Sequence, residues 1–352
     1  MAEELEAILG YLAPLIAADT QNPPRAIDGE HPLLASIRQS LPGFDIFVED
    51  LGEGCLIIEA IRGQTDLVFN VHMDTVPVAP GWSHHPHTLT RGDDRAFGLG
   101  TCDTKGAAAI LFALAARTDA PMHLLLTTDE EAGQSRCIRS YLEREREHRC
   151  AIVAEPTDGL ARLSNRGLVS ARMSFRGQSG HASVAGGRSA VHDAARLIST
   201  ALEQPWAEEN RLNFGRIEGG QKPNMIAAEA VLLFGFRSLP GTDHSELLES
   251  LAGIVPDADL APRFVGPALP SDADGHSAKA QEHALQLAEE WGLATGEPVD
   301  FWTEASLFSE AGTPAIVLGA GSIKQAHAPD EFVTYEQLLT VSSLYERIIS
   351  HG

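Results

Sequence analysis

The sequence predicts an α/β fold in which a doubly wound, mostly parallel sheet carries an inserted α+β domain. Short, uniformly apolar runs are typical of strands covered on both faces, and they occur at 66–72, 122–128, 150–155 and 314–318. Helical patterns at 105–117 and 134–146 separate the first three runs. Strands that alternate with helices indicate a sheet with helices on both of its faces.

A change of pattern after about Arg166 predicts the insertion. Strand-like segments at 168–175, 213–217 and 225–237 are interspersed with helical segments at 189–202 and 244–251. A stretch rich in Pro, Asp and Gly at 262–276 is interpreted as the linker back to the first domain. Helices at 3–18, 277–291 and 334–350 complete that domain. We therefore predict a catalytic domain at 1–166 and 273–352, and a βαββαβ-type domain at 167–272.

Composition excludes several classes of partner. The chain has 352 residues, 43% of them hydrophobic, and its 26 basic and 49 acidic residues give a formal charge of −23. Such an excess of negative charge argues against binding to nucleic acid or to an anionic membrane. The first ten residues hold three glutamates and no basic residue, which argues against a targeting signal. Four cysteines without a paired spacing are typical of the reduced thiols of a cytoplasmic protein.

Residues of the kinds that bind metal ions stand at the ends of the predicted strands. The carboxyl ends of parallel strands meet at one edge of a sheet, where open α/β folds place their sites. Two imidazoles and three carboxylates suit a pair of borderline cations such as zinc. The candidate ligands are His72, Asp103, Glu131, Glu155 and His327, with Glu130 next to the third of them.

Each of these residues alone has an ordinary explanation. A single histidine at a strand end is usually a satisfied polar group, and Asp103 could simply be the N-cap of the following helix. Cys102, beside it, is a weak candidate for a lone nucleophile. The joint pattern favours a metal site, because four strand ends all lead into ligand-type residues.

A series of motifs resembles one family along nearly the whole chain. This is the family of acetylornithine deacetylase, succinyl-diaminopimelate desuccinylase and carboxypeptidase G2, which are dinuclear metallohydrolases. The matching motifs are His72-Met-Asp-Thr-Val-Pro77, Gly98-Leu-Gly-Thr-Cys-Asp-Thr-Lys-Gly106, Thr128-Asp-Glu-Glu131, Ala154-Glu-Pro-Thr157, Gly177-Gln-Ser-Gly-His181 and Ala326-His327.

The resemblance implies a ligand set for two divalent metal ions, zinc first and cobalt as the alternative. Asp103 would bridge both ions. His72 and Glu155 would complete one site, and Glu131 and His327 the other. Three carboxylates nearly balance the charge of two such ions, which agrees with this assignment. The family also implies a cis peptide bond between Asp103 and Thr104.

Other residues receive catalytic and binding roles from the same resemblance. Glu130 would be the general base, and Asp74 would orient the imidazole of His72. Asp74 could otherwise be an ordinary turn residue. His181 would be the lid histidine that stabilises the oxyanion, although Ser183-Val-Ala-Gly-Gly187 replaces the proline that family members usually have after it.

The substrate implied is a small N-acyl amino acid with a free carboxylate. Asn224 and Arg237 match positions that hold this carboxylate, and Arg237 lies in an apolar strand where bidentate pairing is attractive. Similarity in Phe69-Asn-Val-His72, Asp300-Phe-Trp-Thr-Glu-Ala-Ser306 and Asp330-Glu-Phe-Val-Thr334 favours N-acetylcitrulline, an intermediate of arginine biosynthesis. N-acetylornithine and N-succinyl amino acids are the alternatives. The inserted domain is expected to act as a lid and to form a homodimer.

Two rival interpretations use the same fold. An aminopeptidase or dipeptidase would need an acidic group for a free ammonium, whereas Arg237 favours a free carboxylate. A non-catalytic metal-binding or interaction protein should have lost a ligand or the base, yet all five ligands and Glu130 are present. The sequence therefore favours hydrolysis of a linear amide.

Overall fold

The computed structural model describes residues 2–144 and 147–351, and these form two compact units. The first unit contains the residues up to Leu163, then His276–Pro298, then the residues from Thr303 onward. The second contains Ser164–Gly275 and Val299–Trp302. The second unit is thus inserted into the sequence of the first.

A six-stranded sheet lies at the centre of the first unit. The sheet contains four parallel strands, at residues 122–127, 67–72, 150–153 and 315–317. These strands are buried along their whole length, as expected for a sheet covered on both faces. The other two strands are antiparallel additions at one side. The order is β1 (Asp45–Asp50), β2 (Leu56–Arg62), β6 (Met122–Thr127), β3 (Leu67–His72), β7 (Cys150–Val153) and β14 (Ala315–Val317). The predicted mostly parallel sheet is confirmed.

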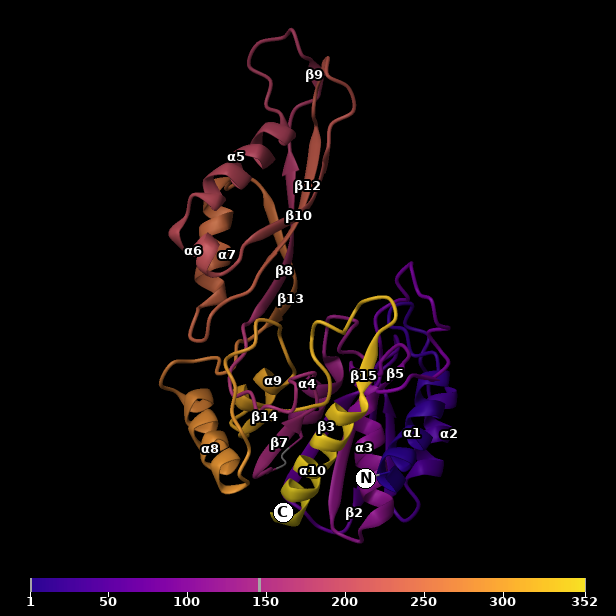
Figure 1. Cartoon of the computed structure of the whole chain (residues 1–352). Coiled ribbons are helices and arrows are strands. Elements are labelled where there is room, and N and C mark those ends of the chain that lie inside the picture. The colour runs from indigo at the N-terminus through magenta and orange to yellow at the C-terminus, as the bar shows by residue number, and fades with distance from the viewer. Residues whose placement is uncertain (1, 145–146, 352) are drawn as a thin grey trace. The chain divides into compact units, whose positions relative to one another are not determined.

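Two groups of helices pack against this sheet (Figure 1). One group is α1 (Ala2–Ala17), α2 (Pro32–Ser40), α3 (Lys105–Arg117) and α10 (Tyr335–His351); the other is α4 (Arg136–Leu142), α8 (His276–Glu290) and α9 (Ala305–Glu310). A small three-stranded sheet joins β15 (Phe332–Thr334), β5 (Arg95–Phe97) and β4 (Thr90–Arg91).

Alternation along β3 fixes which way its side chains point. Leu67, Phe69 and Val71 belong to the hydrophobic core that also contains α1, α3 and α10. Because successive side chains of a strand point to opposite faces, Asn70 and His72 point to the other face. The polar residues of this strand are thereby directed away from the main core.

The second unit is a four-stranded antiparallel sheet with helices on one face. Val169, Ala171, Met173 and Phe175 alternate along its central strand and form a core with those helices. The sheet order is β10 (Asn213–Gly219), β12 (Glu229–Phe236), β8 (Leu168–Arg176) and β13 (Asp259–Gly266), and the helices are α5 (Ala190–Leu202), α6 (Pro205–Glu209) and α7 (His244–Ile254). A separate pair joins β9 (Gly180–His181) to β11 (Met225–Ile226).

The predicted return linker at 262–276 is wrong in its first part, because β13 occupies Asp259–Gly266. Pro262 made the segment look like a loop. It is tolerated because β13 is an edge strand and the pairing register shifts between Pro262 and Phe264.

Two other predicted elements need new bounds. The predicted helix at 134–146 is the shorter α4, and residues 145–146 lie outside the described residues. The predicted strand at 225–237 is two strands, β11 and β12, with Ala227 and Ala228 between them.

No helix of the described residues is both long and apolar enough to cross a membrane. The four cysteines are free and buried.

Candidate metal centre

The predicted ligands of the first unit gather at the carboxyl ends of the parallel strands. His72 ends β3, Glu155 comes two residues after β7, and Glu131 comes four residues after β6. Asp103 lies just before α3, whose N-cap position is taken by Thr104. Since Asp103 is not the N-cap of this helix, the ordinary explanation for an aspartate at this position does not apply.

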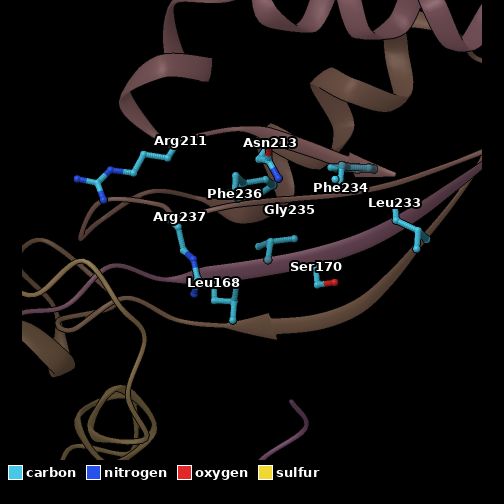
Figure 2. A pocket seen from close by; sticks show the side chains of 11 residues that line it. Leu168, Ser170, Arg211, Asn213, Leu233, Phe234, Gly235, Phe236 and Arg237 are labelled. Atoms are coloured by element: carbon cyan, nitrogen blue, oxygen red, sulfur yellow. The ribbon is translucent and has the colours of Figure 1, made fainter. Parts of the chain in front are cut away.

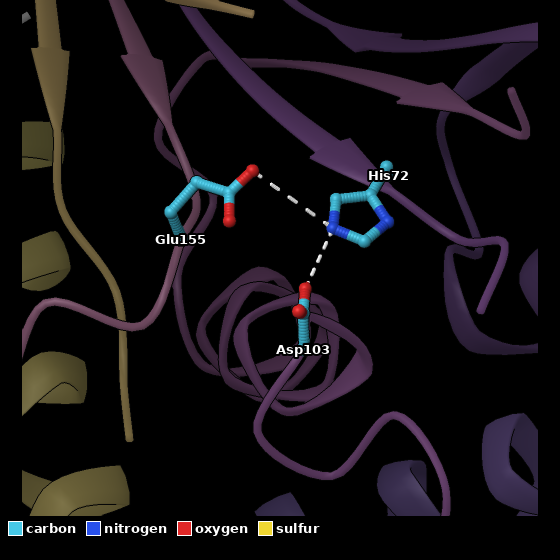
Figure 3. Close-up of side chains that lie close together, drawn as sticks. All are labelled: His72, Asp103 and Glu155. Atoms are coloured by element: carbon cyan, nitrogen blue, oxygen red, sulfur yellow. Dashed lines mark hydrogen bonds and ion pairs between the residues drawn. The ribbon is translucent and has the colours of Figure 1, made fainter. Parts of the chain in front are cut away.

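One group of candidate ligands is buried. His72 Nε2 lies 2.9 Å from Asp103 Oδ1 and 3.9 Å from Glu155 Oε1, and Figure 3 shows both carboxylates pointing to the same ring nitrogen. The three residues are 3–6% exposed. His72 Nδ1 donates to the main-chain oxygen of Asp74 at 3.1 Å, so the ring presents Nε2 to the carboxylates.

A second group shares Asp103 with the first. His327 Nε2 lies 3.3 Å from Asp103 Oδ2 and 2.8 Å from Glu131 Oε1. The two oxygens of Asp103 therefore face two different histidines, as a bridging carboxylate would. Within each group the potential ligand atoms lie within 4.8 Å of one another. The side chain of His327 is 51% exposed, so this second group is open to solvent.

The electrostatics of the two groups favour added positive charge. Burial, reinforced by Asp103, raises the pKa of Glu155 well above its usual value, and burial also raises the pKa of Glu131. Although burial opposes it, hydrogen bonding to Asp103 and Asp74 raises the pKa of His72 well above its usual value. Crowded carboxylates and imidazoles of this kind fit two divalent cations, which would relieve the repulsion among the acids.

Asp74 and Glu130 lie beside the ligands without belonging to either group. Asp74 Oδ2 accepts a hydrogen bond from the main-chain N–H of Glu131 at 2.9 Å, and Asp74 Oδ1 lies 3.6 Å from His72 Nδ1. Asp74 thus lies next to one residue of each ligand group, His72 of the first and Glu131 of the second. Burial, with Glu131 and Glu155 nearby, raises the pKa of Glu130 well above its usual value, which is the direction expected of a general base working near neutral pH.

A glycine turn allows the chain to pass close to Glu155. A Cβ on Gly319 would lie 2.5 Å from the main-chain oxygen of Glu155 and 3.0 Å from its nitrogen. Any larger residue at this position would therefore push against the segment that carries a candidate ligand.

The site residues predicted in the second unit fall into two places. His181 pairs with Met225 across β9 and β11, and its Nδ1 lies 2.7 Å from Ser183 Oγ. The main-chain oxygen of Asn224 accepts a hydrogen bond from Ala182 at 3.0 Å, so Asn224 lies close to His181. Both residues lie near the start of β12.

Arg237 directly follows the other end of β12. This strand has 8 residues and, at about 3.3 Å per residue, spans about 25 Å. Arg237 lines a cavity of about 320 Å³ with Arg211, Asn213 and Ser170, on the sheet face opposite the helices (Figure 2). The second unit therefore does not bring Arg237 together with His181 and Asn224.

Two buried carboxylates near the ligands were missed in the sequence. Glu304, the residue before α9, is 1% exposed. With the Asn70 amide in the orientation that satisfies both of its polar atoms, its nitrogen donates to Glu304 Oε2 at 3.2 Å. Burial raises the pKa of Glu304 to about 8. Glu331 is 2% exposed and accepts hydrogen bonds from the loop before Asp103. Two sequence signals could have marked it: it lies four residues after His327, and it belongs to the stretch Asp330-Glu-Phe-Val-Thr334.

Comparison with known proteins agrees with this arrangement. A family model described as peptidase family M20/M25/M40 matches residues 68–351. The chain belongs to this family. The match includes all the candidate ligands and the whole inserted unit, so the family resemblance predicted from the motifs is confirmed.

Two curated relatives of this M20 member carry deacetylase names. The chain is 43% identical to N-acetyl-L-citrulline deacetylase of Xanthomonas campestris pv. campestris over 99% of both chains. It is 31% identical to acetylornithine deacetylase of Erwinia tasmaniensis over 84% of this chain and 82% of that protein.

Solved structures share the M20 fold at lower identity. The aminopeptidase PepT of Bacillus cereus matches with a TM-score of 0.74 and 20% identity over 98% of both chains. The M20 metallo-carboxypeptidase Sso-CP2 of Sulfolobus solfataricus matches with a TM-score of 0.74 and 18% identity over 99% of both chains. These likenesses establish the two-unit fold.

Proposed function

We propose that the chain hydrolyses the amide bond of N-acetylcitrulline, releasing acetate and citrulline, with two divalent cations at the centre built around Asp103. The observation that carries the proposal is the pair of ligand groups that share this one carboxylate, with Glu130 left over beside them. Full-length similarity to a protein named N-acetyl-L-citrulline deacetylase supports the choice of substrate. The reaction would belong to arginine biosynthesis.

Each group of side chains has a defined task in this reaction. His72, Asp103 and Glu155 would hold one cation, and His327 and Glu131, with Asp103, would hold the other. When bound, zinc or cobalt ions would supply Lewis acidity and a water of lowered pKa. Glu130 would take a proton from the attacking water as the water oxygen bonds to the acetyl carbon. The C–N bond breaks, and Glu130 returns the proton to the leaving amine nitrogen.

The cavity around Arg237 supports a substrate with a carboxylate and a neutral side chain. Arg237 offers a guanidinium for bidentate binding of the carboxylate. No acidic side chain is among the residues that line the cavity. Asp300 lies nearby, but its carboxylate forms ion pairs with Arg166 at 3.1 Å and with Arg211 at 2.9 Å. A neutral ureido group is therefore favoured over an ammonium. An ammonium in this cavity would lie beside arginines and would find no carboxylate with which to pair.

The geometry of the second unit supports a dimer in which two chains build each site. His181 and Asn224 lie about 25 Å from Arg237 along β12. A single N-acetyl amino acid is much shorter than this. If Arg237 binds the substrate carboxylate, His181 reaches the same substrate from a second chain, where it would stabilise the oxyanion.

A panel of substrates tests the proposal. The apoprotein is reconstituted with zinc or cobalt, and kcat/KM is measured for N-acetylcitrulline, N-acetylornithine, an N-succinyl amino acid and a dipeptide. We expect the largest value for N-acetylcitrulline. A clear preference for N-acetylornithine would change the substrate but keep the deacetylase, whereas turnover of the dipeptide alone would overturn the proposed function.

A further inference from the structure

One buried carboxylate holds the loop that leads to the shared ligand. Glu331 Oε1 accepts hydrogen bonds from the main-chain N–H groups of Cys102 at 2.8 Å and Asp103 at 3.1 Å. Its Oε2 accepts a third from Gly100 at 2.9 Å. The main-chain oxygen of Glu331 accepts a fourth from Gly98 at 3.0 Å. The whole segment from Gly98 to Asp103 is thus attached to a single residue.

Glu331 itself is fixed by its position in the chain. The next residue, Phe332, begins β15 and pairs with Phe97 of β5, so Glu331 lies at a defined point of the small sheet. His327 is only four residues earlier. A single side chain therefore connects the segment that carries Asp103 to the segment that carries His327, although the two ligands are far apart in sequence.

Neighbouring contacts complete the attachment of Asp103. The hydroxyl of Thr104 donates to the main-chain oxygen of His72 at 2.7 Å, which connects Asp103 to the end of β3. Gly100 has a φ of +86°, and a Cβ there would lie 3.0 Å from side-chain carbons of Lys105 and Thr75. The presence of glycine at position 100 therefore allows the loop to direct its main-chain N–H groups toward Glu331.

We propose that Glu331 is a positioning residue that sets the direction of the Asp103 carboxylate toward both metal sites. It does so through main-chain hydrogen bonds rather than by touching an ion or the substrate. The main-chain N–H of Asp103 is one of its three donors, so movement of Glu331 moves the residue whose oxygens face His72 and His327. This inference rests on the proposed metal centre.

The substitution Glu331→Gln tests the role with little change of shape. A glutamine amide offers one oxygen and one NH₂ group, so at least one of the three main-chain N–H donors would face another donor. Partners that orient metal ligands typically change metal affinity or activity by about 10–100-fold when they are removed. We expect the dissociation constants of both ions to rise by about this factor. In turnover, kcat should fall while KM changes little, because Glu331 does not contact the substrate.

The readout is metal binding to apoprotein, measured by competition with a chelator of known affinity, together with the visible absorption spectrum of the Co²⁺ protein. Glu59→Gln is the matched control. Glu59 is also a buried carboxylate of the first unit, 3% exposed, and it pairs with His123 and Arg144 rather than with a ligand segment. Melting temperatures of both apoproteins show how much each substitution destabilises the fold.

The outcomes separate the inference from the function on which it rests. If the unsubstituted protein fails to bind two ions, the proposed metal centre is wrong. If it binds two ions and Glu331→Gln binds them equally tightly, the role of Glu331 is wrong. Equal losses of affinity in Glu59→Gln and Glu331→Gln would also overturn the role, because the effect would then be general destabilisation.

A second variant covers the case in which Glu331→Gln does not fold. Glu331→Asp keeps the negative charge but shortens the side chain by one methylene, so its oxygens no longer reach the loop as Glu331 does. We expect it to lose metal affinity as well. Affinity as high as that of the unsubstituted protein would mean that the charge alone matters, and it would overturn the positioning role.

Discussion

Mixing two inactive variants tests whether His181 serves the site of a second chain. His181→Ala alone should lower kcat by about 10²–10³-fold, because an oxyanion donor is lost. Glu130→Gln removes the proposed base. In a twofold-symmetric dimer, random exchange of equal amounts makes about half of the molecules heterodimers. Each heterodimer has one site with neither defect, so about a quarter of the activity of the unsubstituted protein should return.

This prediction follows from the separation of His181 and Arg237 at the two ends of β12. The assay follows citrulline release after mixing, while native mass spectrometry of differently tagged chains reports the heterodimer fraction. A mixture of Glu130→Gln with His327→Ala is the control. Both residues would act in the metal centre of their own chain, so each site of a heterodimer keeps one defect and no site is rescued. Complete exchange without returning activity would refute action of His181 in a second chain.

Three further substitutions test individual assignments. Glu130→Gln should lower kcat by at least about 10²–10⁴-fold while metal content stays near two ions per chain, and near-normal turnover would rule out Glu130 as the base. Arg237→Met should lower kcat/KM by about 10–100-fold, mainly through KM, because charge-assisted hydrogen bonds to the carboxylate are lost; an unchanged KM would contradict this role. Asn213→Asp places a carboxylate in the same cavity and should raise the kcat/KM ratio of N-acetylornithine to N-acetylcitrulline by about fivefold. A ratio that does not move would separate this cavity from the substrate's side chain.

The parts of the fold that the sequence predicted are those with a regular pattern. The strands ending at His72 and Thr127 are mostly apolar, so their burial on both faces could be predicted, and the helix predicted at 105–117 is found at Lys105–Arg117. The convergence of ligands could be predicted for the same reason, because parallel strands bring their carboxyl ends to one edge.

The missed elements depend on contacts that are distant in sequence. β2 was not predicted, because Glu59 interrupts its apolar run; this charge is buried against Arg144 at 2.9 Å. Glu331 could not be assigned a role, because its partners at Gly100 and Asp103 lie 231 and 228 residues away. Such residues become visible only when the main-chain donors around them are known.

Titration of the apoprotein with zinc, with citrulline release from N-acetylcitrulline measured at each step, tests the central claim most directly. Two ligand groups that share Asp103 predict negligible activity without metal and a plateau at two zinc ions per chain. Full activity in the thoroughly demetallated protein, or no release of citrulline at any zinc content, would contradict a two-metal deacetylase.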